Sequence, residues 1–182
     1  MTDTLSRRGF LGQGLAGSLA LALAAPARAA DTPAARRLRF YNTHTAEKLD
    51  ITYFEQGVYH DGALAEIDFI LRDFRANEAA PMARGVIDLV HDLTLALESD
   101  APVHIISGYR SSKTNDLLRR TGGGGVAKRS LHMDGMAIDL RVPGRDLARV
   151  RAAALALARG GVGYYPGDGF VHVDTGRVRR WG

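Results

Sequence analysis

The chain has 182 residues, with 24 lysines and arginines against 20 aspartates and glutamates, and a formal net charge of +4. Such a small charge argues against a dedicated nucleic-acid-binding protein. The sequence contains no cysteine, which excludes disulfides, thiolate metal sites and cysteine nucleophiles.

The N-terminus carries the features of an export signal. Residues 6–11 (SRRGFL) form a twin-arginine signature, an uncharged apolar stretch runs to Pro26, and residues 27–29 (ARA) resemble a signal-peptidase site. We therefore expect a signal peptide over 1–29 and a periplasmic protein exported by the twin-arginine pathway. The apolar stretch is short and rich in glycine and alanine, so no stable membrane span is expected after cleavage. An uncleaved anchor is the alternative.

The rest of the chain predicts a short tether over 30–36 and one domain over 37–182. Alternating and helically spaced apolar residues predict first a hairpin of strands 37–41 and 48–54, then helices 63–75 and 84–98 and a strand 103–107. A brief helix capped by Thr114 and ending at Arg119 is expected next, followed by a mobile glycine loop 122–125 and a strand 136–142. The last predicted elements are a helix 145–159 ended by Gly160 and paired strands 162–165 and 170–174. These elements indicate a single α+β domain with a mainly antiparallel sheet packed against several helices.

Two segments carry a candidate metal site. His132 and Asp139 lie seven residues apart, with Gly135 allowing a sharp turn between them, and His172 follows in a strand-like run. Strand alternation places Asp139 on a face that could line a cleft. Two imidazoles and one carboxylate with an open fourth position are the ligand set of a hydrolytic zinc site, and zinc in such a site favours amide hydrolysis. We predict one zinc ion per chain. The other four histidines are interpreted as structural: His44, His60, His91 and His104.

These motifs also resemble a known family. The pattern S-x-H-x-x-G-x-A-x-D over 130–139, preceded by SGYRS over 107–111 and followed by His172, is similar to zinc peptidases of the D-alanyl-D-alanine metallopeptidase group, which is related to lysostaphin-type enzymes and the hedgehog signalling domain. Residues 160–166 and 170–176 resemble the murein endopeptidase branch of that group. The resemblance implies an exported enzyme that acts on peptidoglycan stem peptides and hydrolyses crosslinks between D-alanine and meso-diaminopimelate.

The resemblance also places Arg110 beside the metal. A guanidinium there could hold a substrate carboxylate or stabilise a developing oxyanion, and a structural ion pair is the alternative. Tyr109, Tyr164 and Tyr165 are candidates for the groove lining, of which Tyr109 and Tyr165 are expected to contact substrate; simple core packing is the alternative for them.

The general base does not follow the family pattern. Relatives supply it as a glutamate three residues or a histidine two residues before the last ligand, where this chain has Gly169 and Phe170. Asp174 is the first candidate and Asp168 the second. Asp174 could instead orient His172.

Two other functions stay open at this point. A D-alanyl-D-alanine carboxypeptidase would trim stem ends rather than crosslinks. A zinc-stabilised peptidoglycan-binding module without catalysis would explain the missing base.

Overall fold

The computed structural model describes residues 34–121 and 127–182. The elements follow in chain order: β1 (Arg36–Asn42), β2 (Lys48–Glu55), β3 (Val58–Tyr59), α1 (Asp61–Ile70), α2 (Arg84–Ala96), β4 (Val103–Ser107), α3 (Ser112–Thr121), β5 (Ala137–Arg141), α4 (Leu147–Leu157), β6 (Gly161–Tyr165), β7 (Phe170–Asp174) and β8 (Arg179–Trp181). None of the helices in this part of the chain has the length and apolar character needed to cross a membrane.

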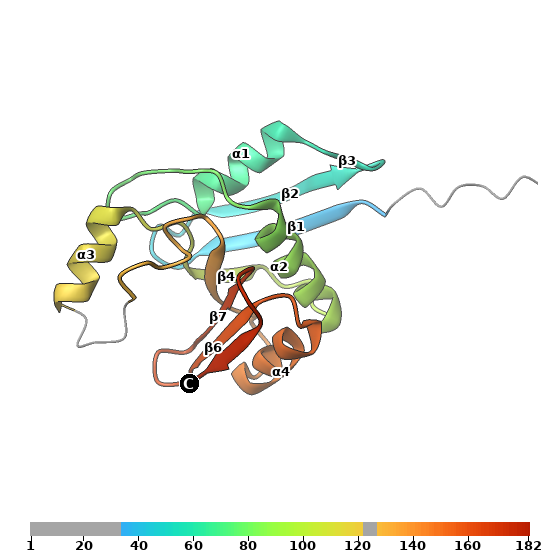
Figure 1. Ribbon diagram of the computed structural model, residues 1–182. Helices are drawn as coiled ribbons and strands as arrows, with labels where there is room; N and C mark the ends of the chain where they lie inside the picture. The colour runs from blue at the N-terminus through green and yellow to red at the C-terminus, as the bar shows by residue number, and fades with distance from the viewer. Residues whose placement is uncertain (1–33, 122–126) are drawn as a thin grey trace, which may run out of the picture. The chain divides into compact units, whose positions relative to one another are not determined.

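The strands form one eight-stranded sheet in the order β3-β2-β1-β4-β5-β7-β6-β8. Two pairs are parallel, β1 with β4 and β6 with β8, and the other pairs are antiparallel. Helix α1 packs on β2, α2 on β1 and α4, and α4 on β6 and β7, while α3 stands apart from them (Figure 1). The predicted α+β class with a mainly antiparallel sheet is confirmed.

Strand alternation divides the sheet into two faces. Core side chains such as Phe40, Ile105 and Leu140 are buried toward the helices. The alternating positions point to the opposite side, which we call the site face and define by Tyr41, His104, Asp139, Arg141 and His172.

A buried carboxylate ties α2 to the strand hairpin. Asp88 accepts hydrogen bonds from the hydroxyls of Tyr53 and Tyr59 and pairs with Arg36 at 2.6 Å. Burial opposes ionisation of Asp88, but the hydrogen bonds from Tyr59, Arg36 and Tyr53 outweigh it and hold its pKa below the ordinary value. The ionised carboxylate therefore stabilises this junction.

Two predicted helix ends were wrong. Helix α1 ends at Ile70 rather than at 75, because Asp73 accepts hydrogen bonds from the backbone N–H groups of Arg75 and Ala76 and turns the chain. Thr114 lies inside α3 rather than capping it, and the Ser111 hydroxyl accepts the Thr114 N–H instead.

Short strands and the ends of the described chain account for the other differences. β3 and β8 were not predicted because they span only two and three residues. Strand β1 begins at Arg36, the last residue of the predicted tether and one residue before the predicted start of the domain. The predicted leader over 1–29 and the glycine run 122–125 lie outside the described residues.

Candidate metal centre

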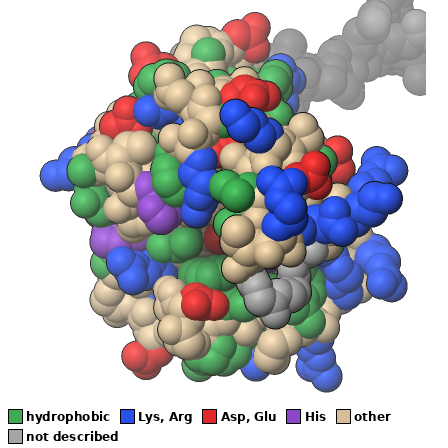
Figure 2. All heavy atoms as spheres, turned by 90° about the vertical axis from the view of Figure 1, so that its left-hand side faces the viewer, with side chains coloured by type: hydrophobic (Ala, Val, Ile, Leu, Met, Phe, Trp, Pro, Cys, Tyr) green, Lys and Arg blue, Asp and Glu red, His purple; other side chains and the backbone are tan. Residues whose placement is uncertain are grey.

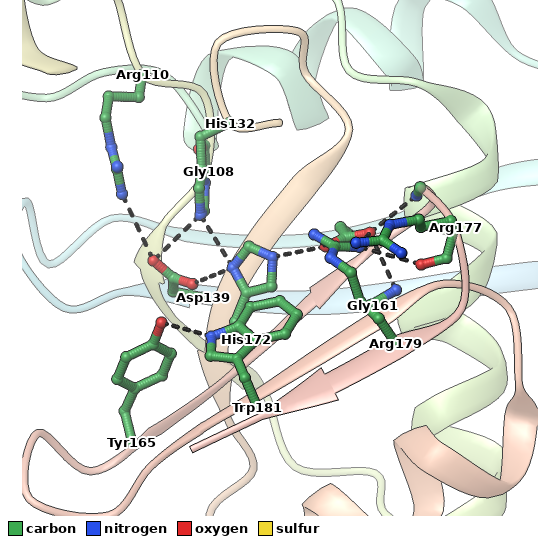
Figure 3. A network of polar contacts seen from close by, with 12 residues as sticks. Gly108, Arg110, His132, Asp139, Gly161, Tyr165, His172, Arg177, Arg179 and Trp181 are labelled. Carbon is green, nitrogen blue, oxygen red and sulfur yellow. Dashed lines mark hydrogen bonds and ion pairs between the residues drawn. The ribbon is translucent and has the colours of Figure 1, made fainter. Parts of the chain in front are cut away.

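The structure brings His132, Asp139 and His172 together (Figure 3). Asp139 in β5 is the direct cross-strand partner of His172 in β7, and His132 comes from the loop before β5. The Nδ1 atom of His172 lies 2.8 Å from one Asp139 oxygen, and Nε2 of His132 lies 3.3 Å from the other. All three side chains are buried.

Gly135 folds the loop that carries His132. Its φ of +66° lies in the left-handed region, and a Cβ there would stand 2.4 Å from the carbonyl oxygen of Pro81. The turn is closed by a hydrogen bond from the Met136 N–H to the Leu131 carbonyl. The predicted sharp turn between the imidazole and the carboxylate is therefore present.

Hydrogen bonds fix which nitrogen of each imidazole faces the centre. The Nδ1–H of His132 donates to the Gly108 carbonyl at 2.7 Å, and the Nε2–H of His172 donates to Asp174 at 2.9 Å, because these oxygens can only accept. The other two ring nitrogens then carry lone pairs and lie 3.2 Å from each other beside the Asp139 carboxylate. Lone pairs meeting at one point repel one another unless a cation lies between them, so these donors fit a divalent metal ion.

The charges of the centre support the same interpretation. Burial alone would raise the pKa of the Asp139 carboxyl, but His132 and His172 hold it well below its usual range. For His172 the directions are reversed: burial alone would lower the pKa of the imidazole. The hydrogen bonds to Asp139 and Asp174 outweigh the effect of burial and raise this pKa. Since a metal binds only the deprotonated ring nitrogen, metal binding at His172 competes with protonation.

Asp174 lies on the far side of the His172 ring from Asp139. Its buried carboxylate accepts hydrogen bonds from His172, from two nitrogens of Arg179, and from the backbone N–H groups of Gly161 and Gly176. Burial would raise the pKa of Asp174, but its hydrogen bonds, led by that from His172, hold it far below the usual range. This geometry favours the second of the two roles considered for Asp174, that of orienting His172.

Arg110, which the resemblance placed beside a metal, lies next to Asp139. One of its terminal nitrogens lies 3.7 Å from Asp139, and the side chain is largely buried. Its Nε is buried without a hydrogen-bond partner among the described residues. Burial, the largest effect, lowers the pKa of Arg110, and Asp139 opposes this change. Arg110 also lines the cavity over the centre, where its guanidinium could donate to a substrate oxygen.

A cavity of about 450 Å³ opens over these residues. Besides the three candidate ligands and Arg110, its wall contains Ala127, Arg129, Ser130, Leu131, Tyr165, Asp168, Phe170, Arg179 and Trp181. Figure 2 looks onto the α3 end of the domain and shows lysine and arginine side chains gathered on one side of that face. A hollow with basic and aromatic walls suits an anionic peptide.

The three tyrosines predicted to line the groove occupy different positions in the structure. Tyr165 lines the cavity, where its hydroxyl accepts a hydrogen bond from Nε1 of Trp181 at 2.8 Å. Tyr109 lies outside the cavity wall and donates its hydroxyl proton to Glu78 instead. Tyr164 packs under the guanidinium of Arg151. The structure therefore brings only Tyr165 to the candidate centre.

Several residues of the site were not predicted from the sequence. Gly108 lies in the SGYRS motif, but its role depends on its backbone carbonyl, which a sequence motif does not reveal. Arg179 and Trp181 act through an ion pair and a ring contact and belong to no motif identified in the sequence. The presence of Trp181, the only tryptophan of the chain, was the one available signal. The histidines interpreted as structural (His44, His60, His91 and His104) lie outside the three-residue group in the described part of the chain.

Comparison with known proteins identifies the family. The model of the family described as "Peptidoglycan L,D-endopeptidase MepK" matches residues 30–181. The chain is 41% identical over 177 residues to the peptidoglycan L,D-endopeptidase MepK of Escherichia coli (strain K12), covering 97% of each chain. It is 39% identical over 151 residues to the probable peptidoglycan L,D-endopeptidase MepK of Haemophilus influenzae, covering 82% of this chain and 81% of the relative. The chain belongs to this family.

Among solved structures, the L-Ala D-Glu endopeptidase ChiX of Serratia marcescens is similar over 40% of this chain and 61% of that one. The sequence identity is 28% and the TM-score 0.31.

Proposed function

We propose that this protein is a zinc-dependent endopeptidase that hydrolyses peptide crosslinks in peptidoglycan. The observation that carries the proposal is the meeting of three metal-binding side chains, His132, Asp139 and His172, in the wall of a cavity that also contains Arg110. Family membership supports peptidoglycan as the substrate.

Different residues of the site are proposed to have different roles in amide hydrolysis. The two imidazoles and the carboxylate would hold the zinc ion, which would supply Lewis acidity and lower the pKa of a bound water. Arg110 lines the cavity beside Asp139, and its guanidinium is proposed to hold the oxyanion formed from the scissile carbonyl. Tyr165 is held by Trp181 at the same wall and is proposed to contact the substrate.

Asp168 is the carboxylate best placed to move the proton. It is exposed at the cavity wall, in the turn between β6 and β7, so it can exchange protons with solvent and with a leaving amine. Asp174 is buried behind His172 and occupied by five hydrogen bonds, so we assign it the positioning of that ring.

The bond that is cut has two candidates. The names of the relatives specify an L,D-endopeptidase, and we propose that this chain also cuts a bond between an L- and a D-configured residue. The D-alanyl–meso-diaminopimelate crosslink expected from the sequence is the second candidate. The two bonds occur in different crosslinked dimers, so product masses distinguish them.

Export completes the proposal. The twin-arginine signature and the signal-peptidase-like residues 27–29 support delivery of the folded chain to the periplasm, where peptidoglycan lies. Cleavage after residue 29, with a short tether that ends before β1 at Arg36, is proposed over retention as an anchor.

The test is digestion of purified crosslinked muropeptide dimers, with products identified by mass. We expect monomers from the zinc-loaded protein, none after chelation, and none from His172→Ala. The matched control His91→Ala, a histidine on α2 away from the centre, should keep full turnover. Loss of a terminal D-alanine with intact dimers would instead identify a carboxypeptidase. Binding of dimers without hydrolysis would identify the non-catalytic module.

A further inference from the structure

A row of side chains crosses the site face next to the metal centre. Tyr41 in β1 pairs in register with His104 in β4, and His104 pairs with Arg141 in β5. These three residues therefore lie side by side across three adjacent strands. The exposed fraction of each is larger than that of the core residues that alternate with them.

The row has a defined offset from the candidate ligands. Arg141 follows Asp139 by two residues in β5, so both side chains point to the site face. Two residues of a strand span about 7 Å. A substrate peptide extended along the strands would thus place a group two residues from the scissile amide over Arg141.

The positive charge of Arg141 is not paired with an acidic side chain in the described part of the chain. The side chain is exposed, its guanidinium has no hydrogen bond or ion pair among residues 34–121 and 127–182, and a Cβ on Gly169 would lie 3.9 Å from its Nη1. Gly169 belongs to the turn between β6 and β7, whose neighbours Asp168 and Phe170 line the cavity. Arg141 therefore lies between the cavity and the rest of the row.

A second hollow, of about 850 Å³, lies at the end of the row away from Arg141. Two members of the row, Tyr41 and His104, line it, and so do Arg39 and Lys48. Asp50 is the acidic residue there, and it is already paired with Arg37 and Arg39. The rings of Tyr41 and His104 lie 4.9 Å apart, and Nδ1 of His104 is buried without a partner among the described residues. The hollow thus offers positive charge and an aromatic wall.

We propose that this row is a second substrate subsite, in which Arg141 binds a free carboxylate of a stem peptide about two residues from the scissile bond and the arm beyond it lies over His104 and Tyr41. The proposal rests on the proposed function, because cleavage of a crosslink requires two peptide arms that extend from the metal centre. Stem peptides carry free carboxylates, and an arginine binds them with paired hydrogen bonds.

The test compares two crosslinked dimers, one with free stem carboxylates and one with those groups converted to carboxamides. Arg141→Ala should raise KM for the carboxylate dimer about tenfold, as expected for a lost charge-assisted hydrogen bond, with kcat unchanged. KM for the carboxamide dimer should stay the same. The matched control is Arg149→Ala, which removes an exposed arginine of α4 on the other side of the sheet.

A binding measurement separates this proposal from the proposed function. With chelator present, fluorescence anisotropy of a labelled carboxylate dimer should show about tenfold weaker binding to Arg141→Ala than to the wild-type protein. Equal affinities would overturn the subsite, whether or not the dimer is cleaved when metal is added. A weaker affinity for the variant, together with no cleavage by the zinc-loaded wild type, would support the subsite and reject the proposed function.

Discussion

Replacement of Asp174 by asparagine tests the proposed role of Asp174 in orienting His172 toward a metal. In the native site the Nε2–H of His172 donates to one oxygen of Asp174, while the other oxygen accepts from Gly161, Gly176 and Arg179. An asparagine that keeps the second set of contacts must turn its NH₂ group toward Nε2 of His172. Two donors then face each other.

The imidazole can relieve this conflict by moving its proton from Nε2 to Nδ1. Because Nδ1 is the nitrogen that faces Asp139, the proton then blocks the proposed ligand atom. Loss of such a partner weakens metal binding about 10- to 100-fold. Removal of the buried charge also leaves Arg179 partly unpaired and should lower the free energy of unfolding by about 3 kcal/mol. This value is near the low end for a broken buried ion pair, because Arg179 is partly exposed.

The assay is competition for zinc between the protein and a chromophoric chelator, with urea unfolding of the metal-free protein as the stability measurement. Asp168→Asn is the matched control, which should bind zinc as tightly as the wild type but turn over more slowly. The positioning role is refuted if Asp174→Asn binds zinc with wild-type affinity and loses only turnover, since that result identifies Asp174 as the base.

Three further predictions concern separate parts of the chain. Arg110→Ala should keep its zinc and lose about 100-fold in kcat, as oxyanion donors do, and an unchanged kcat would remove it from the mechanism. Asp88→Asn should lower the free energy of unfolding by about 2 kcal/mol at pH 7. Because the pKa of Asp88 is lowered in the folded state, the loss of unfolding free energy in the variant is complete above the ordinary carboxyl pKa of about 4 and should shrink as the pH falls below it. If urea unfolding shows the same difference between variant and wild type from pH 7 to pH 3, the assignment of Asp88 is contradicted. Gly163→Ala would place a Cβ 2.6 Å from the Trp181 ring and should shift the single tryptophan's emission and cost about 1–3 kcal/mol of stability, so an unchanged spectrum and stability would show that the ring has room.

The sequence predicted the elements that carry strong periodicity. The hairpin, the strands of 103–107 and 170–174 and the helix at 145–159 appear close to their expected bounds. Errors fell where local side-chain hydrogen bonds decide the structure, as at Asp73, which ends α1, and Ser111, which caps α3. Periodicity carries no information about such contacts.

The candidate ligands were predictable because each came with its own local pattern. Strand alternation indicated the face of Asp139 within its strand and the face of His172 within its own, and the register of β5 against β7 makes them direct neighbours. The same alternation put Asp174 on that face but could not show that it lies behind the His172 ring. That distinction depends on Arg179 and on backbone donors from distant parts of the chain.

The central claim is that His132, Asp139 and His172 bind one divalent ion on which crosslink hydrolysis depends. Its most direct test is a zinc titration of the metal-free protein in which bound metal and monomer release from crosslinked dimers are followed in the same sample. We predict that both rise together and reach a plateau at one zinc ion per chain, and that His132→Ala abolishes both. Full hydrolysis before zinc is added, or unchanged zinc binding by His132→Ala, would contradict it.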